Sequence, residues 1–406
     1  MKKAGGFVFM RVSRRYLLAL ISYALNAMVV IPIAVQALPL QQQTLVLGGQ
    51  QYSVNVPTGY VFELITTDID RPRMLTFHSD GSLFAGSRSG KVYRIAPPYI
   101  KTQVLNNRFR YPHSVAFRDG KIFVASAEGL YSGNYISTNP LRISNLKKNI
   151  SLPETGHNSR TVKIGPDNRM YLSLGISGNC SDEYLGVGYA PSVQRGGVIV
   201  LDEADAPTWK VYSSGLRNPV GFDWSPYNGE LYASNNGPDH WGFEQPPEQF
   251  THLSEGSFHG MPWYQYDGSQ VTRDPCISVS SPRPVTDIQK PVATFPARNA
   301  PMAVTFVPVD NVFGALSGNA LVALHGSWAT RYAGDKASRR PPKLAMVRFE
   351  QGKAVGVEDV ITGFQMANGT RWARPTGIAI GPDNAIYIAS DGEPSAVFRL
   401  RKALSD

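Results

Sequence analysis

Apolar and polar residues follow one another along this chain in a pattern that recurs six times. Each copy has a turn rich in Arg, Asn, His or Pro, an apolar strand, a polar turn and a second apolar strand. A repeat of this length made of strands predicts radial blades, and six copies predict an all-β, six-bladed β-propeller. Roughly 60 residues per blade leave room for four antiparallel strands. The copies cover residues 73–86, 113–125, 161–173, 219–234, 301–324 and 375–389.

A closed ring of blades needs a strand that ties its two ends together. We expect part of residues 44–66 to pair with residues 398–401 and complete the last blade, which would remove free sheet edges. No linker-like gap interrupts the repeats, so residues 38–406 are predicted to form one propeller domain.

Three long insertions follow the second strand of the third, fourth and fifth repeats. They cover residues 175–197, 236–300 and 326–343. Equivalent connections of a propeller emerge on one face, and loops gathered on one rim usually build a functional site. Tolerated surface loops are the simpler alternative.

The first 37 residues differ from the rest of the chain. Basic residues, among them Arg14 and Arg15, precede an apolar run over residues 16–35, and Ala37 ends a small-residue cleavage pattern. Residues 1–37 are therefore predicted to be an export signal, with an uncleaved membrane anchor as the alternative. An export signal would place the protein in the periplasm or outside the cell. The paired arginines also resemble part of a twin-arginine signal.

Charge and motifs exclude several classes of function. The N-terminal segment carries five basic and no acidic residues, so without it the net charge falls from +9 to +4. A balance this mild does not call for nucleic acid or a lipid surface as a partner, beyond an N-terminal anchor. The sequence contains no zinc signature, phosphate-binding glycine loop or Gly-x-Ser-x-Gly motif. Cys180 and Cys276 are the two cysteines, and in an exported protein they either pair or stay as free thiols.

Two repeats open with residues that could act in catalysis. His157 precedes the first strand of the third repeat, where it could serve as a general base or merely satisfy a turn. Arg217 precedes the fourth repeat beside Asn218-Pro219, and it could polarise a carbonyl oxygen or join two blades in an ion pair.

Further candidates follow the later strands. Residues 235–239, Asn-Asn-Gly-Pro-Asp, offer hard oxygen ligands suited to calcium, although the same residues also make an ordinary turn. Lys343 and Arg374 could add two positive charges to the same mouth, where a small acidic ligand would need them. Taken singly, such cations are usually solvated.

With these residues in view, the sequence resembles the soluble pyrroloquinoline-quinone-dependent glucose/sorbosone dehydrogenase family. The resemblance runs from about Pro57 to Leu400. Its most specific stretch is Gly-Leu-Arg-Asn-Pro at 215–219 with Asn-Gly-Pro at 236–238. His-Gly-Ser-Trp at 325–328, with Trp-Gly at 241–242, is closer to the sorbosone branch than to the glucose branch.

The resemblance implies a role for each candidate. His157 would take the proton from a sugar hydroxyl while hydride moves to the quinone, and Arg217 would bind the quinone oxygen where negative charge develops. The main-chain carbonyls of Gly237 and Pro238 would hold calcium, which would polarise the cofactor. The remaining cofactor contacts would come from Asn218, Asn236, Lys343 and Arg374.

Three positions depart from the family pattern. Ile176 stands where the glucose branch has an acidic residue that orients the base, so Asn179 or Asp182 would have to substitute, or His157 is a poorer base. Thr376 replaces a second arginine of that branch. Arg298 stands where the sorbosone branch tends to have histidine.

These observations predict an exported enzyme that oxidises a sugar or sugar-derived aldehyde with pyrroloquinoline quinone and Ca²⁺, and that passes electrons to an external acceptor. Two alternatives stay open. One is a binding propeller that has lost catalysis. The other is a metal-dependent sugar lactonase, which needs carboxylates converging on one metal in the central channel and is disfavoured by the many cations proposed for this site.

Overall fold

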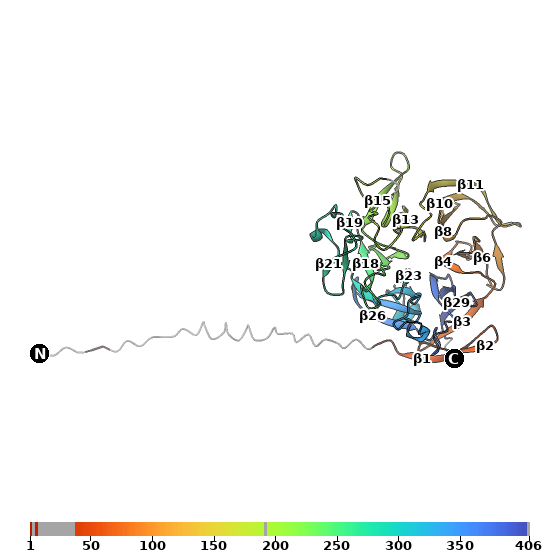
Figure 1. Cartoon of the computed structure of the whole chain (residues 1–406). Helices are drawn as coiled ribbons and strands as arrows, with labels where there is room; N and C mark the ends of the chain where they lie inside the picture. The colour runs from red at the N-terminus through yellow and green to blue at the C-terminus, as the bar shows by residue number, and fades with distance from the viewer. Residues whose placement is uncertain (2–4, 7–36, 191–192, 404–406) are drawn as a thin grey trace. The chain divides into compact units, whose positions relative to one another are not determined.

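The computed structural model describes residues 1, 5–6, 37–190 and 193–403. Residues 38–406 form one compact unit, in which six four-stranded sheets are arranged as the blades of a propeller (Figure 1). The predicted fold is confirmed. The predicted export signal lies almost wholly outside the described residues. No helix among the described residues has the length and apolar character needed to cross a bilayer.

The strands of the first five blades run outward from the central axis in sequence order. The first contains β4 (Pro72–Phe77), β5 (Leu83–Ser87), β6 (Tyr93–Ile95) and β7 (Thr102–Val104), and the second contains β8 (Pro112–Arg118), β9 (Lys121–Ser126), β10 (Gly129–Ile136) and β11 (Arg142–Ser151). The third contains β12 (Val162–Ile164), β13 (Met170–Leu174), β14 (Gly197–Asp202) and β15 (Thr208–Ser214), to which β19 (Ser257–Phe258) adds in parallel.

The remaining blades follow the same plan. The fourth contains β16 (Phe222–Trp224), β17 (Leu231–Asn235), β18 (Glu248–Leu253) and β22 (Ala293–Phe295), and the fifth contains β23 (Pro301–Phe306), β24 (Ala320–Leu324), β25 (Lys343–Glu350) and β26 (Lys353–Ile361). The sixth joins β27 (Pro375–Ile380), β28 (Ile386–Ser390) and β29 (Ala396–Lys402) to β3 (Tyr60–Thr66) from the other end of the chain. Outside the blades lie the hairpins β1 (Leu40–Leu47) with β2 (Gln50–Pro57) and β20 (Tyr264–Tyr266) with β21 (Val271–Arg273), and the 3₁₀ turns η2 (Val285–Asp287), η3 (Asn311–Leu316) and η4 (Lys336–Ser338).

The predicted closure is confirmed for β3. This strand pairs antiparallel with β29, with Leu64 opposite Phe398 and Phe62 opposite Leu400. The rings of Phe62 and Phe398 lie 4.9 Å apart in the core, so the seam is closed by packing as well as by hydrogen bonds. The earlier part of the predicted range instead forms the β1–β2 hairpin.

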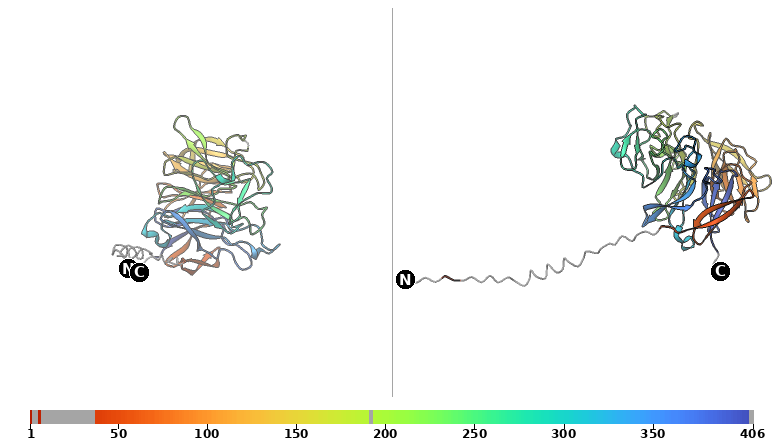
Figure 2. Two further views of the ribbon diagram at one scale, coloured as in Figure 1. Left: turned by 90° about the vertical axis from the view of Figure 1, so that its left-hand side faces the viewer. Right: turned by 60° about the horizontal axis from the view of Figure 1, so that its bottom comes forward.

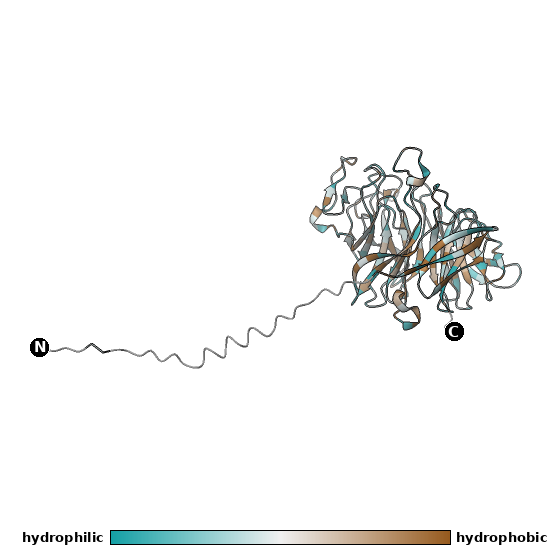
Figure 3. Ribbon diagram, turned by 90° about the horizontal axis from the view of Figure 1, so that it is seen from below, coloured by the Kyte–Doolittle hydropathy of each residue, from teal (hydrophilic) through white to brown (hydrophobic). Residues whose placement is uncertain are grey.

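The innermost strands approach one another closely around the axis. Gly221 has no room for a side chain, because a Cβ there would collide with the main chain of Met302 in the next blade. Threonine hydroxyls join neighbouring inner strands, as where Thr305 donates to the Ile378 oxygen at 3.1 Å. Both apolar and polar residues occur along the strands (Figure 3).

The long insertions emerge on one rim, as predicted. They follow β13, β17 and β24, the second strands of three blades. Because adjacent strands are antiparallel, the ends of second strands lie beside the starts of innermost strands. His157, Arg217 and Arg374 all precede innermost strands, so the fold brings them to the rim that carries the insertions. Figure 2 shows the propeller from two further sides.

Candidate active site

The imidazole of His157 is oriented by the main chain. Its Nδ1 lies 2.5 Å from the carbonyl oxygen of Ile176, and the His157 amide donates to the same oxygen at 3.1 Å. A carbonyl only accepts, so Nδ1 carries the proton and Nε2 keeps a free lone pair in the neutral ring. Among the described residues neither Asn179 nor Asp182 bonds to the imidazole, so the expectation that one of them substitutes is wrong, and the other alternative, a poorer base at His157, stays a prediction. The imidazole is held by the main-chain oxygen of the isoleucine itself.

Two buried arginines hold the loop that carries His157. Arg160 donates to the main-chain oxygens of His157 and Pro153, both at 2.7 Å. Arg195 donates to the oxygen of Thr155 at 2.8 Å and to that of His157 at 3.4 Å. Each guanidinium satisfies several carbonyls at once, so the loop before β12 is fixed although it has no regular structure.

Burial keeps the imidazole neutral. It lowers the pKa of His157 to about 4, and the nearby charge of Arg217 acts in the same direction. The hydrogen bond to Ile176 opposes this shift only in part. At neutral pH the Nε2 lone pair is therefore available to accept a proton.

Arg217 is buried and aimed by three neighbours. Only 5% of the residue is exposed. Its Nη2 and Nε donate to the side-chain oxygen of Asn179 at 2.7 and 3.1 Å, and Nη2 lies 3.3 Å from Asp239. Its Nη1 donates to the main-chain oxygen of Asn236 at 3.4 Å. Burial lowers the pKa of Arg217, and Asp239 opposes that effect. Asn179 thus serves the arginine, not the histidine.

Asn218 and Asn236 lie in the same cluster. A Cβ on Gly175 would come within 2.7 Å of both Asn218 Oδ1 and His157 Cβ, so the absence of a side chain at Gly175 lets these two residues approach. The side-chain amide of Asn236 donates through Nδ2 to the main-chain oxygen of Pro301 at 2.7 Å and so joins the fourth blade to the fifth.

One of the two expected metal ligands, the Pro238 oxygen, already has a partner within the chain. The amide of Gly237 donates to Glu248 at 2.6 Å. Glu248 is fully enclosed, and burial raises its pKa to about 7. The carbonyl oxygen of Pro238 accepts a hydrogen bond from Nη1 of Arg298 at 2.8 Å. One of the two carbonyls predicted to face a metal is therefore already occupied by a cation of the chain.

Arg374 belongs to a second polar group at the start of the sixth blade. Its Nη2 lies 2.8 Å from Nδ1 of His325, whose Nε2 lies 2.6 Å from Asp391. Asp391 also pairs with Arg73 at 2.6 Å. Burial alone would raise the pKa of Asp391, but His325 and Arg73 hold it far below its usual range. The neighbouring Thr376 is fully buried and donates to a main-chain oxygen, so it contributes no charge to the mouth.

Lys343 is not brought into these clusters. Its ammonium lies 2.6 Å from Asp359 on β26, the outermost strand of its blade. The side chain itself is engaged by a carboxylate of the same blade.

Other cations, missed by sequence reasoning, lie beside Arg374. A pocket of about 420 Å³ is lined by Lys336, Arg339, Arg371 and Arg374, with Asp391 on its wall. Within the described residues, Nη1 of Arg371 and Nε of Arg339 are buried without a hydrogen-bond partner. Arg73, Arg118 and Arg160 also carry a buried guanidinium N–H group without a partner, so what distinguishes this pocket is the number of cations that line it. Lys336 and Arg339 lie in the third insertion, and Arg371, in the loop before β27, bonds to Ser327 of that insertion. No local sequence motif distinguishes these three residues from ordinary surface cations.

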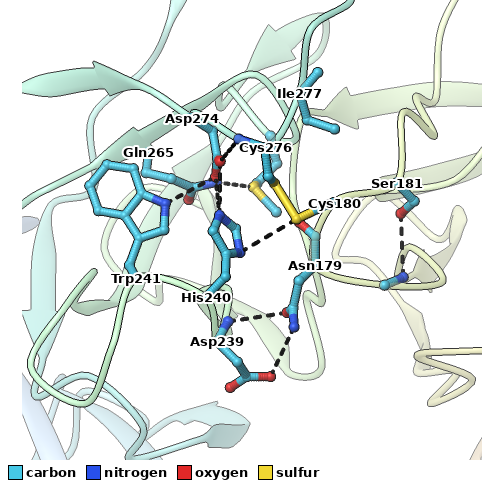
Figure 4. Close-up of a disulfide and its surroundings, with 12 residues drawn as sticks. Asn179, Cys180, Ser181, Asp239, His240, Trp241, Gln265, Asp274, Cys276 and Ile277 are labelled. Carbon is cyan, nitrogen blue, oxygen red and sulfur yellow. Dashed lines mark hydrogen bonds and ion pairs between the residues drawn. A yellow bond between two sulfur atoms is a disulfide. The ribbon is translucent and has the colours of Figure 1, made fainter.

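A disulfide joins the first and second insertions. Cys180 and Cys276 pair, which settles the two alternatives left open by the sequence (Figure 4). Asn179 precedes the first cysteine, and its side chain accepts from the Asp239 amide at 3.1 Å. His240 follows Asp239, packs beside the disulfide and pairs with Asp274 (Figure 4). The crosslink therefore lies directly behind the residues that aim Arg217.

The described residues offer little support for a metal-dependent hydrolase. The narrow centre of the channel is lined by small and apolar residues such as Met74, Ala303 and Ile378. One group of three potential metal ligands occurs among the described residues, formed by Cys180, His240 and Cys276, and its two sulfurs are bonded to each other. No carboxylate cluster of the kind a lactonase needs is found in that part of the chain.

Comparison with known proteins identifies the family to which the chain belongs. The sequence profile described as Glucose / Sorbosone dehydrogenase matches residues 142–399. The chain belongs to the glucose/sorbosone dehydrogenase family. The match contains His157, Arg217, Asn236 and Arg374. Membership in this family supports an oxidoreductase of the sugar dehydrogenase type, built on the propeller described above.

Relatives of this glucose/sorbosone dehydrogenase-family chain include an uncharacterized protein of Borreliella burgdorferi. The two are 23% identical over 356 residues, which cover 84% of this chain and 88% of the relative. Among solved structures, the holo pyranose dehydrogenase PQQ domain of Coprinopsis cinerea matches with a TM-score of 0.68 and 19% identity, over 86% of this chain and 97% of that one. The apo soluble aldose sugar dehydrogenase of Escherichia coli matches with a TM-score of 0.61 and 14% identity, over 85% and 100%. These likenesses show the shared fold.

Proposed function

We propose that this chain oxidises a sugar, an aldose or a sugar-derived aldehyde by hydride transfer to pyrroloquinoline quinone, and that an external acceptor removes the electrons. The observation that carries the proposal is the grouping on one rim of a neutral imidazole, a buried arginine and a pocket lined by four cations, in a member of the glucose/sorbosone dehydrogenase family. The names of the pyranose and aldose sugar dehydrogenases agree with this class of substrate.

The cations at the mouth suit a tricarboxylate. Arg374, Arg371 and Arg339 line one pocket, together with Lys336. The three arginines are proposed to bind carboxylates of the quinone, with Asn218 and Asn236 as further contacts. Lys343 would have to leave Asp359 to take part. When bound, the quinone supplies the carbonyl carbon that accepts the hydride.

His157 is proposed as the general base. Its Nε2 lone pair would accept the hydroxyl proton of the substrate as the neighbouring C–H bond breaks, or the proton of a hydrated aldehyde. The Ile176 oxygen, already bound to Nδ1–H, would stabilise the resulting imidazolium. Its pKa near 4 keeps the imidazole unprotonated at neutral pH, at the expense of basicity.

Arg217 is proposed to stabilise developing negative charge. Its guanidinium is held by Asn179 and Asp239 before any ligand binds, so little reorganisation is needed during the reaction. Donors arranged in this way typically contribute about 10²–10³ in kcat.

Export of the protein is part of the proposal. The basic and apolar segment at residues 1–37 has the composition of an export signal. The Cys180–Cys276 disulfide supports an oxidising compartment such as the periplasm or the extracellular space.

Dye-linked oxidation of aldoses and sugar aldehydes by the purified full chain tests the proposal. With added quinone we expect dye reduction that depends on substrate, and we expect His157→Gln to lower kcat by about 10²–10⁴ while quinone binding persists. Quinone binding with no dye reduction for any sugar or aldehyde would favour the catalytically silent binding propeller instead.

A further inference from the structure

The guanidinium of Arg298 occupies a cage of oxygens next to the expected calcium position. Its Nη1 donates to the Pro238 oxygen at 2.8 Å and to Oδ1 of Asp239 at 2.7 Å. Its Nη2 donates to the Asp239 main-chain oxygen at 2.5 Å, to Gly242, and to Gln245 at 3.4 Å. Four main-chain carbonyls and one carboxylate oxygen, all from the loop after β17, thus surround a single positive charge.

Such a ring of oxygens is the usual environment of a hard metal ion. Calcium prefers carboxylate and main-chain carbonyl oxygens contributed by one loop. In this chain the same kind of oxygens is neutralised by a permanently charged side chain, whose planar nitrogens offer several N–H donors.

The main chain holds Arg298 in this place. Arg298 and Ala300 have φ angles of +72° and +50°, which residues other than glycine rarely adopt. The intervening Asn299 accepts from the Gly326 amide at 3.0 Å, and the Ala300 oxygen accepts from the His325 amide at 3.1 Å. The side chain is buried, with 7% of the residue exposed. The segment is therefore anchored to the third insertion with Arg298 directed at the loop.

Arg298 and calcium would compete for this position. A Ca²⁺ ion bound to the Pro238 oxygen at a normal ligand distance would lie within about 5 Å of Nη1 of Arg298. Two like charges this close, with one oxygen shared between them, repel each other, and the carboxylate of Asp239 is already paired with Arg298. The residues present consequently do not fit the calcium site that the family resemblance implies for Gly237 and Pro238.

We propose that Arg298 replaces the metal ion, so that this chain binds its quinone without Ca²⁺. The statement about the quinone rests on the proposed function, whereas the statement that the wild-type loop binds no Ca²⁺ does not. Arg298 also holds Asp239, which lies 3.3 Å from Arg217, so the built-in cation helps to position the arginine proposed to act in catalysis.

Two titrations of the wild-type full chain, freed of metal with EGTA, test the inference. Quinone binding is followed by absorbance in EGTA and in millimolar CaCl₂, and we expect the two Kd values to agree within about twofold. The thermal midpoint is followed against CaCl₂ without quinone, and we expect no shift, because a ligand that does not bind the native state cannot stabilise it.

The Arg298→Ala variant supplies the opposite expectation. Without the guanidinium the oxygens of the loop are free, so CaCl₂ should raise the thermal midpoint and tighten quinone binding by about tenfold or more. Arg331→Ala is the matched control, since Arg331 is exposed and pairs with Glu244 of the same loop at 3.0 Å without touching the carbonyls. It should behave like the wild type. If Arg298→Ala does not fold, Arg298→Lys keeps the charge and is expected to stay insensitive to Ca²⁺.

The outcomes separate this inference from the proposed function. A wild-type chain that binds quinone only with Ca²⁺, or whose thermal midpoint rises with CaCl₂, overturns the inference and leaves the dehydrogenase proposal standing. A wild-type chain that binds no quinone in either buffer overturns the dehydrogenase proposal. In that case the thermal titration alone decides whether Arg298 replaces calcium.

Discussion

At the residue scale, the chemistry of this site depends on how main-chain oxygens are distributed. One carbonyl, that of Ile176, fixes the tautomer of His157. Another, that of Pro238, is bound by Arg298. In the pattern that the family resemblance implies, a carboxylate orients the histidine and a metal ion binds the carbonyl oxygen. In this chain a main-chain oxygen holds the imidazole, and the guanidinium of Arg298 binds the carbonyl oxygen. An isoleucine at position 176 is therefore compatible with an oriented base.

The pKa of His157 leads to a prediction about pH. Burial lowers it to about 4, so the base form persists down to mildly acidic pH. We expect the acidic limb of kcat/KM to lie between about pH 4 and 5, well below the ordinary histidine value near 6.5. Steady-state rates across pH, at temperatures where circular dichroism shows folded protein, provide the measurement. A limb at pH 6.5 or above would contradict the environment described for His157.

Sequence reasoning reached some of these residues and not others, for physical reasons. His157, Arg217 and Asn236 stand in short motifs at strand boundaries, and strand boundaries fix where a side chain lies. Arg339 and Arg371 lie in irregular loops whose path has no local signature. A main-chain acceptor such as the Ile176 oxygen is invisible in sequence, because every residue carries a carbonyl.

At the level of single strands, the pattern of apolar residues predicts the inner strands of the blades but not the outer strands. The pairs β4–β5 and β27–β28 match the predicted repeats because both faces of these strands are buried. In contrast, β11 is mostly exposed, with Lys147 and Lys148 among its residues, so its pattern is that of a polar surface strand. Its place in the sheet is set by hydrogen bonding to β10.

The seam between β3 and β29 is expected to be essential for stability. Phe398 is buried against Phe62 and Trp372, and Phe398→Ala should lower the free energy of unfolding by about 3–5 kcal/mol. Arg401→Ala on the same strand removes a partly exposed ion pair with Glu63 and should cost less than about 1 kcal/mol. Denaturant unfolding of the two variants gives the comparison. Equal effects would mean that the seam does not depend on its core.

At the scale of the whole molecule, buried histidines make stability depend on pH. Burial lowers the pKa of His113 and His259 to about 3 and of His157 and His325 to about 4. In the unfolded chain they titrate near 6.5. Between these values the unfolded state binds more protons, so stability falls as pH decreases. Glu248, with its pKa raised to about 7, acts in the opposite direction, but it is one group against four.

We therefore expect the thermal midpoint of unfolding to decrease as the pH is lowered from 7 to 5. Each buried histidine contributes a slope of up to about 1.4 kcal/mol per pH unit in that range. His259 lies between the hydroxyls of Thr251 and Ser257, and His259→Gln should flatten the dependence because one titrating group is lost. Scanning calorimetry at several pH values provides the test. A midpoint that stays level or rises on acidification would show that these rings are protonated in the native state.

We propose that distant cations and one imidazole meet at one mouth and hold an acidic quinone there. Titration of the full chain with pyrroloquinoline quinone, followed by absorbance both in EGTA and in CaCl₂, tests it most directly. We expect saturable one-to-one binding that Arg374→Ala weakens by about tenfold or more, the loss expected for one charge-assisted contact. Absence of saturable binding in both buffers would contradict it.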